Sequence, residues 1–171
     1  MWKNVAITIL IIACAGIGYW GYQEKQEKEQ IAIQAENSYQ KAFNSLTYQV
    51  GLLNDKIGTT LAMNSRSSLS PALTEVWRIT SEAQNEVGML PLGLLPFNET
   101  EEFLSEIGNF SYQVAVRDLE KEPLSDDEYA VLENLYEKSD EIQSELRDVQ
   151  QKVIENNLKW KAYMLHTNIK K

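Results

Sequence analysis

Several residue types that build common active sites are scarce in this chain of 171 residues. It contains one cysteine, Cys14, and one histidine, His166. A single cysteine excludes an intramolecular disulfide. One histidine with no cysteine beside it cannot supply the convergent ligands of a zinc site or a catalytic triad. The glycines are scattered, so the chain has no glycine-rich phosphate loop. The sequence therefore predicts no metal site and no cofactor.

Basic residues, prolines and glycines are also few. Sixteen Lys and Arg stand against 25 Asp and Glu, which leaves a formal net charge of −9. Nucleic-acid-binding proteins present basic patches to phosphates, so neither DNA nor RNA is expected as a partner. Four prolines and eight glycines are too few for an all-β fold with many turns.

Carboxylates are abundant, and a pair of carboxylates can hydrolyse a glycosidic bond. Here, however, they stand at expected helix starts, where negative charge complements the helix dipole, and on solvated helix faces. We assign this structural role to Glu99, Glu101, Glu102, Glu106, Asp126, Asp127 and Glu128. The sequence predicts no catalytic residue, and therefore no enzyme.

Residues 5–22, VAITILIIACAGIGYWGY, form the one long apolar stretch and contain no charge. At about 1.5 Å per residue, a helix of this length spans roughly 27 Å, close to the hydrocarbon thickness of about 30 Å. Aromatic residues flank the stretch, as is typical of membrane interfaces. We therefore expect residues 1–22 to form a single-pass anchor that contacts lipid through residues 5–22. Its marker residues are Trp2, Ile9, Leu10, Tyr19 and Trp20.

Two cleavable signals compete with this interpretation. Ala13-Cys14-Ala15 has the small residues of a signal-peptide cleavage site, and residues 11–14 have the residue types of a lipoprotein signal. Both require the apolar run to end near residue 15, whereas it continues to Tyr22, which favours the uncleaved anchor. The flanking basic residues do not decide the orientation. We expect the N-terminus on the cytoplasmic side of the membrane and the bulk of the chain on the outer side. A tail of only a few residues remains on the cytoplasmic side more easily than it crosses the membrane.

The remaining residues, 23–171, have the pattern of an all-α domain, an antiparallel bundle of about four helices. Apolar residues recur there at steps of three and four, which predicts helices near 23–63, 71–88, 99–121 and 126–169. In the first of them, an apolar stripe runs from Tyr39 to Leu61. Gly51 and Gly58 lie within this helix and would let another helix approach closely.

The last predicted helix carries a heptad seam from Leu132 to Tyr163. The seam packs either inside the bundle or in a dimer, so self-association stays open. Ser139 and Asn156 are polar residues on the seam. Both are expected to fix the register in which the helices pack. For Asn156 the alternative is that the core ends there and its side chain lies in solvent.

Four local signals predict where the helices begin and end. Ser70-Pro71 reads as an N-cap followed by proline at the first helical position. Residues 98–101 (NETE) and 125–128 (SDDE) read as capping boxes. Residues 121–123 (KEP) are expected to end the third helix, because the residue before a proline resists helical geometry.

The segment 89–97, MLPLGLLPF, is apolar but interrupted by two prolines. It cannot form a helix of any length. It either folds over one end of the bundle as part of the core or forms an exposed surface for a partner. For the second alternative, the expected contact residues are Leu92, Leu94, Leu95 and Phe97.

Several runs of residues resemble the N-terminal region of the YpeB family of spore germination proteins from endospore-forming Bacilli. They are AENSYQKAF (35–43), DKIGTTLAMNSR (55–66), SPAL (70–73), VWRITSEA (76–83), LPL (90–92), LPF (95–97) and RDLEKEPL (117–124). The resemblance extends along nearly the whole chain. These runs are too long and too particular to reflect helix composition alone.

The resemblance implies a location and a partner. Proteins similar to YpeB are single-pass proteins of the spore inner membrane, with their bulk on the cortex side, and they are not enzymes. They act with the cortex-lytic enzyme SleB, and each supports the stable presence of the other. The family also carries PepSY repeats after this region, which this chain lacks. The resemblance therefore leaves open whether the SleB contact lies here or in those repeats.

Two further function classes are alternatives to this one. One is an extracytoplasmic four-helix-bundle input module of a sensor, which would need a second membrane span that residues 23–171 do not contain. The other is a cell-wall hydrolase, which would need activity on peptidoglycan.

Overall fold

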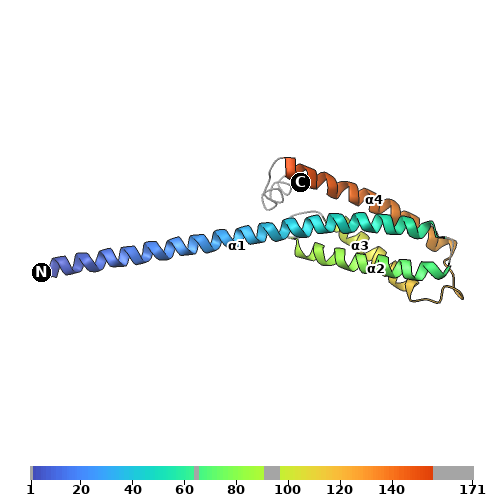
Figure 1. Ribbon diagram of the computed structural model, residues 1–171, viewed down its shortest axis with the longest axis horizontal. Helices are drawn as coiled ribbons and strands as arrows, with labels where there is room; N and C mark the ends of the chain where they lie inside the picture. Colours follow the sequence, from blue (N-terminus) through green and yellow to red (C-terminus); the bar gives the residue numbers. More distant parts are fainter. Residues whose placement is uncertain (1, 64–65, 91–96, 156–171) are drawn as a thin grey trace. The chain divides into compact units, whose positions relative to one another are not determined.

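The structure, a computed structural model, describes residues 2–63, 66–90 and 97–155, with only the helical backbone of residues 3–15, 66 and 67. Within these ranges the chain has four helices and no strand, which confirms the all-α prediction. The helices are α1 (Trp2–Leu61), α2 (Arg66–Met89), α3 (Asn98–Ala115) and α4 (Asp126–Glu155) (Figure 1).

The chain divides into two compact units, residues 1–37 and 38–171. The division falls after Asn37 and not at the expected boundary between residues 22 and 23. The first unit contains the part of α1 before Ser38. The second unit is a bundle formed by the rest of α1 together with α2, α3 and α4.

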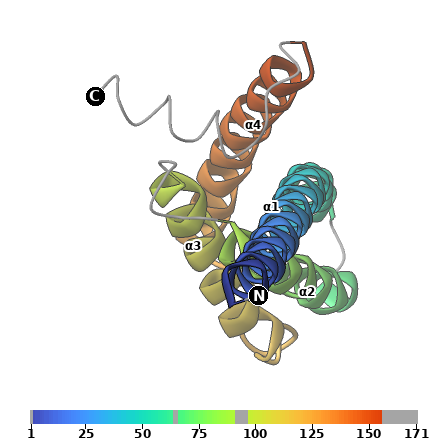
Figure 2. The ribbon, with the colours of Figure 1, turned by 90° about the vertical axis from the view of Figure 1, so that its left-hand side faces the viewer.

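The four helices of the second unit follow one another around the bundle in chain order, which can be traced in Figure 2. A hydrogen bond or ion pair marks each neighbouring pair: Gln49–Glu82 (α1–α2), Gln84–Leu104 (α2–α3), Glu106–Lys138 (α3–α4) and Asn54–Ser139 (α4–α1). These contacts define a four-helix bundle in which successive helices are neighbours.

The apolar stripe predicted on α1 forms the centre of the core. Its fully buried members are Phe43, Leu46, Val50, Leu53 and Ile57. They belong to one cluster with buried residues of α2, α3 and α4. A smaller cluster joins the start of α2 to the end of α3 and the segment after it: Leu69, Leu73, Val114, Leu119 and Leu124.

The start of α2 differs from the prediction. The helix begins at Arg66, so Pro71 lies inside it and Ser70 is not its N-cap. Proline there removes one intrahelical hydrogen bond. The additional turn buries Leu69 in the smaller cluster, which offsets that loss. The Ser70 hydroxyl instead donates to the carbonyl oxygen of Ala115 at 2.7 Å, where it satisfies a carbonyl in the last turn of α3.

The two predicted capping boxes have different outcomes. Ser125 and Glu128 form theirs: the Glu128 N–H donates to Ser125 Oγ at 3.2 Å, and the Ser125 N–H donates to Glu128 Oε2 at 2.8 Å. The box at 98–101 was predicted wrongly, because the N-cap of α3 is Phe97 and no side chain caps it. Burial of the Phe97 ring in the core sets the helix start one residue early.

The third helix is also shorter than the predicted 99–121, since α3 ends at Ala115. Asp118 organises the following residues into a turn. Its carboxylate accepts the N–H of Glu120 at 3.2 Å, and its carbonyl accepts the N–H groups of Lys121 and Glu122. An aspartate that bonds nearby backbone in this way competes with helix.

The face of α1 toward α4 is built on two glycines, as predicted. A Cβ at Gly51 would lie 2.5 Å from Gln143 Nε2, and one at Gly58 would lie 2.9 Å from the Tyr136 ring. One heptad before Gly51, Asn44 Oδ1 accepts a hydrogen bond from Gln150 Nε2 at 2.8 Å. Residues 44, 51 and 58 of α1 thus face residues 150, 143 and 136 of α4. Each step of seven residues forward along α1 is a step of seven residues back along α4, so the two helices run antiparallel in a fixed register.

The heptad seam of α4 is confirmed as far as the structure describes it. Leu132, Leu135, Ile142, Leu146 and Val153 are buried. The polar residue Ser139 is also buried, and its hydroxyl accepts a hydrogen bond from Asn54 Nδ2 at 3.0 Å. A buried polar pair of this kind disfavours other registers, because a slip leaves both groups unpaired. Asn156, Trp160 and Tyr163 lie outside the described residues.

The glycine face yields a prediction about stability. Alanine at Gly51 is expected to raise the free energy of unfolding by about 0.5 kcal/mol, because the gain in helix propensity exceeds the cost of moving the flexible end of Gln143. Alanine at Gly58 is expected to give no gain, since the Tyr136 ring must shift. Urea denaturation followed by circular dichroism measures both.

Gly88 of α2 provides the matched control, because a Cβ there meets nothing within 4 Å. Gly88→Ala should stabilise at least as much as Gly51→Ala. Equal gains at Gly51 and Gly58 would contradict the close approach of Tyr136.

Candidate binding groove

The predicted partner surface is divided by the structure. Leu92, Leu94 and Leu95 lie outside the described residues, so their role stays a prediction. Phe97 was predicted wrongly as an exposed contact, because it is only 7% exposed. Its ring lies 6.3 Å from that of Phe43, centroid to centroid, inside the main core cluster. Phe97 is therefore a core residue, which is the other of the two roles predicted for the segment 89–97.

The predicted membrane anchor lies in the first unit. Trp2, Tyr19 and Trp20 have exposed side chains on α1, whereas the side chains of Ile9 and Leu10 lie outside the described part. Among the residues that the structure describes with their side chains, no helix is long and apolar enough to cross a membrane.

A groove between α2 and α3 is a site that was not predicted from the sequence. Its wall from α2 consists of Trp77, Ser81 and Gln84, and its wall from α3 consists of Ser105, Gly108, Asn109 and Tyr112. The space between them is about 300 Å³. None of the seven residues is charged, although 24% of the chain's residues are Asp, Glu, Lys or Arg.

Two aromatic rings form one end of the groove. The ring centroids of Trp77 and Tyr112 lie 5.8 Å apart, with their planes at 45°. This tilted arrangement is one that aromatic pairs prefer. Trp77 is 42% exposed and Tyr112 is 54% exposed, so both rings present much of their surface to solvent.

The groove is narrow because the two helices approach closely at Gly108. A Cβ on this residue would lie 3.2 Å from Thr80 Cγ2. The Thr80 hydroxyl donates to the Val76 carbonyl at 2.8 Å, which fixes the methyl group toward α3. A larger residue at position 108 would force the helices apart at the centre of the groove.

Polar groups in the groove differ in their partners. Ser81 Oγ donates to the Trp77 carbonyl at 3.1 Å, and Gln84 Nε2 donates to the Leu104 carbonyl at 3.3 Å. Within the described residues, the side chains of Ser105, Asn109 and Tyr112 have no hydrogen-bond partner. The groove therefore offers several neutral donors and acceptors beside two exposed aromatic faces.

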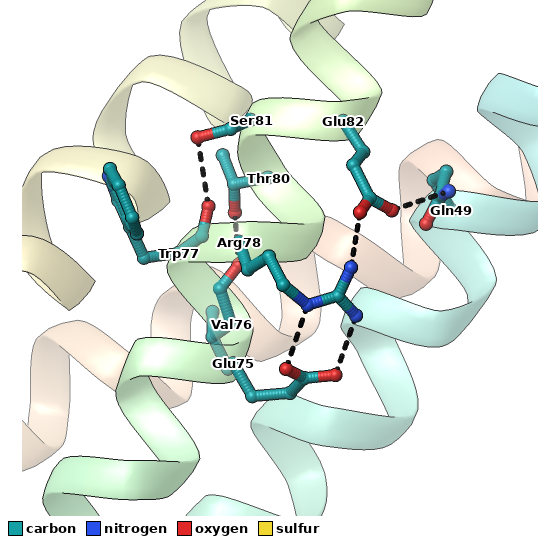
Figure 3. A network of polar contacts seen from close by, with 8 residues as sticks. All are labelled: Gln49, Glu75, Val76, Trp77, Arg78, Thr80, Ser81 and Glu82. Atoms are coloured by element: carbon teal, nitrogen blue, oxygen red, sulfur yellow. Dashed lines mark hydrogen bonds and ion pairs between the residues drawn. The ribbon is translucent and has the colours of Figure 1, made fainter.

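The other side of α2 holds a charged network, shown in Figure 3. Arg78 makes two hydrogen bonds to Glu75, at 2.7 and 2.9 Å, and an ion pair with Glu82. Glu82 also accepts a hydrogen bond from Gln49 of α1 at 3.0 Å. The hydrogen bond from Arg78 lowers the pKa of Glu75. The charged side chains of this network therefore lie on the side of α2 that faces α1, and the residues of α2 that line the groove are uncharged.

A second polar contact holds the connection between α3 and α4. Arg117 donates to both oxygens of Glu128, at 2.8 and 3.0 Å. The side chains are 20% and 27% exposed. Hydrogen bonds, first from Arg117 and then from the Ser125 N–H, together lower the pKa of Glu128 to about 2 against the opposing effect of burial. Glu128 therefore closes the capping box and binds Arg117 with the same carboxylate.

The described part of the chain holds no group of three or more His, Cys, Asp and Glu side chains placed to bind a metal ion. The side chain of Cys14 and all of His166 lie outside that part. The groove itself contains hydroxyls, amides and aromatic rings, a set that can bind a ligand by hydrogen bonding and stacking.

The sequence contains a signal for the groove in the spacing of its uncharged polar and aromatic residues, which apolar periodicity does not detect. Residues 77, 81 and 84, and likewise 105, 109 and 112, recur at helical steps of three and four. Each set forms an uncharged stripe on the exposed side of an amphipathic helix. Their pairing depends on the register of α2 against α3, which only the fold supplies.

The fold and the groove define an all-α helical bundle with a surface suited to recognition. The chain matches the family model described as YpeB N-terminal over residues 27–162. It therefore belongs to the YpeB N-terminal family, as its sequence motifs indicated. No solved structure matches the chain.

Curated relatives agree with this assignment. The sporulation protein YpeB of Bacillus subtilis (strain 168) is 59% identical over 160 residues, which cover 94% of this chain and 36% of the relative. The proteins of the same name from Oceanobacillus iheyensis and Halalkalibacterium halodurans are 52% and 46% identical over the same shares. The chain thus spans about a third of the length of these relatives.

Proposed function

We propose that this chain is a non-catalytic, membrane-anchored module of spore germination that supports the localisation and stability of the cortex-lytic enzyme SleB. The observation that carries the proposal is its membership of the YpeB N-terminal family across residues 27–162. The names of the relatives describe sporulation proteins and no enzyme. A helical bundle that presents contact surfaces fits a supporting role.

The proposed location is the spore inner membrane, with a single pass and the bundle on the cortex side. The uncharged stretch 5–22 supports it by its length and composition. The exposed aromatic residues Trp2, Tyr19 and Trp20 also support it, because such rings prefer the membrane interface.

The proposed SleB contact is the apolar segment that follows Met89. The Met89 side chain is exposed at the end of α2, whereas Leu90 beside it is buried. Leu90 and Phe97, on either side of residues 91–96, are both buried, and the proposal assigns Leu92, Leu94 and Leu95 between them to the partner. The buried Phe97 takes no part in the contact.

A pull-down tests this proposal. The full chain, carrying a C-terminal affinity tag and solubilised in detergent, is expected to retain purified SleB. The double variant Leu94→Ser/Leu95→Ser is expected to retain at least fivefold less, while circular dichroism shows unchanged helicity. Tyr48→Ala, at an exposed position of α1, is the matched control and should retain SleB as the unchanged chain does.

A folded chain that does not retain SleB would contradict the proposal. The contact would then belong to the part of the longer relatives that this chain does not cover. Loss of helicity in the double variant would instead show that Leu94 and Leu95 are core residues, as Phe97 is.

A further inference from the structure

We propose that the groove between α2 and α3 is a binding site for a neutral carbohydrate. The site combines two exposed aromatic faces, an uncharged lining and several hydrogen-bonding groups without partners in the described chain. The inference rests on the groove alone and does not depend on the proposed SleB contact.

The aromatic pair provides the apolar part of the site. A pyranose ring has a face of C–H bonds whose hydrogens carry a small positive charge, because the ring carbons are bonded to oxygen. The π-face of an aromatic ring is negative, so it attracts such hydrogens. With the centroids of Trp77 and Tyr112 at 5.8 Å and 45°, one ring can lie under a sugar while the other stands beside it.

The neutral lining determines the charge of the ligand. A phosphate or carboxylate in a groove needs a basic side chain or a set of N–H groups to replace its hydration. The groove has no Lys or Arg, and the nearby Arg78 is occupied on the other side of α2 by Glu75 and Glu82. The absence of Asp and Glu from the lining likewise disfavours a cationic ligand. An uncharged ligand loses less hydration on entering.

The polar groups fit a ligand that both donates and accepts hydrogen bonds. Asn109 presents a free amide, and Ser105 and Tyr112 present hydroxyls. Gln84 is held by its bond to the Leu104 carbonyl, which leaves its side-chain oxygen as an oriented acceptor. Sugar hydroxyls match such mixed groups, and the acetamido group of an N-acetylated sugar matches the free amide of Asn109.

The size of the site favours a sugar over a folded protein partner. Seven residues line about 300 Å³, whereas a stable protein–protein interface uses about 20–30 residues on each side. The space is at the lower end of the usual range for small-ligand sites, about 300–1,000 Å³. A short oligosaccharide that places one or two of its sugar rings in the groove fits both the number of lining residues and the volume.

Titration with the tetramer of N-acetylglucosamine tests the inference, with cellotetraose as a second neutral probe. The full chain is kept in a zwitterionic detergent without sugar, because glycoside detergents would compete. Saturation-transfer NMR on the oligosaccharide is expected to show binding of at least one probe. Trp77→Ala and Tyr112→Ala should each lower the affinity at least tenfold, while Trp77→Phe should lower it less than fivefold.

Tyr48→Ala is the matched control, because Tyr48 is an exposed aromatic residue on α1 and lies outside the groove. It should change the affinity less than twofold. If Trp77→Ala loses helicity, the loss of affinity is measured with Tyr112→Ala and Asn109→Ala instead. Failure of both sugars to bind at millimolar concentration would overturn the inference, as would equal binding by the groove variants. Binding of an uncharged Gly-Ser-Asn peptide in preference to both sugars would also overturn it.

Discussion

Replacing Phe43 with alanine is expected to lower the free energy of unfolding of the bundle by about 4 kcal/mol, within the usual range for loss of a buried phenylalanine. Phe43 is fully buried at the start of the core stripe on α1 and contacts the ring of Phe97. The truncation removes apolar contacts and leaves a cavity that the surrounding helices cannot fill without moving.

Urea denaturation of the full chain, followed by circular dichroism at 222 nm, measures this effect. Tyr48→Ala provides the control, since Tyr48 lies on the same helix and is 68% exposed. Its effect should stay within about 0.5 kcal/mol. A loss below about 1 kcal/mol for Phe43→Ala would mean that residues 38–155 do not share the core described here.

The same experiment also tests the corrected position of Phe97. If its ring packs on Phe43, the two alanine variants should not be additive. A double-mutant cycle is expected to give a coupling of about 1 kcal/mol, typical of an aromatic pair. Additive losses would return Phe97 to the list of candidate partner contacts.

The second large effect is expected at Glu128 and depends on pH. The Glu128 carboxylate accepts two hydrogen bonds from Arg117 and one from the Ser125 N–H, and its pKa in the folded chain is about 2, against 4.5 for the ordinary group. A depressed pKa stabilises the folded state at pH values above that of the unfolded group. This stability is lost as the pH falls from about 4.5 toward 2.

Glu128→Gln is therefore expected to cost about 2 kcal/mol at pH 7, in the range for hydrogen bonds to charged groups, and to cost little at pH 2. The difference between the two unfolding curves, measured from pH 7 to pH 2, isolates Glu128 from the other carboxylates. Glu133→Gln, on the exposed side of the same helix, is the control and should leave the curve nearly unchanged. A difference that persists undiminished at pH 2 would contradict the role of the charged pair.

This contact matters to the bundle because it spans the connection between two helices. Arg117 follows the end of α3, and Glu128 lies in the first turn of α4. The pair thus fixes where α4 begins relative to α3. The seam residues of α4 and the stripe on α1 belong to one core cluster.

Local chemistry in the sequence predicted much of the bundle. The stripe from Tyr39 to Leu61 predicted the buried face of α1, because apolar residues at steps of three and four fall on one side of a helix. The same rule predicted the seam of α4 through Val153. Ser125 and Glu128 predicted their own capping box, since both partners of a capping box lie within four residues of each other.

Predictions failed where burial competed with local preference. Ser70-Pro71 has the residues of a helix start, yet α2 begins at Arg66 because the additional turn buries Leu69. Asn98 has the residue type of an N-cap, yet Phe97 takes that place because its ring enters the core. In both cases tertiary packing outweighed a local signal of about 1 kcal/mol.

The sequence by itself determined that the described part of the chain is mainly helical, which sides of the helices are apolar, and to which family the chain belongs. Only the tertiary structure decided which exposed residues meet. Trp77 and Tyr112 lie 35 positions apart in the printed sequence, and no local rule pairs them. They form one groove because α2 and α3 approach closely at Gly108, and the register of two helices is set by the whole core and not by either helix alone.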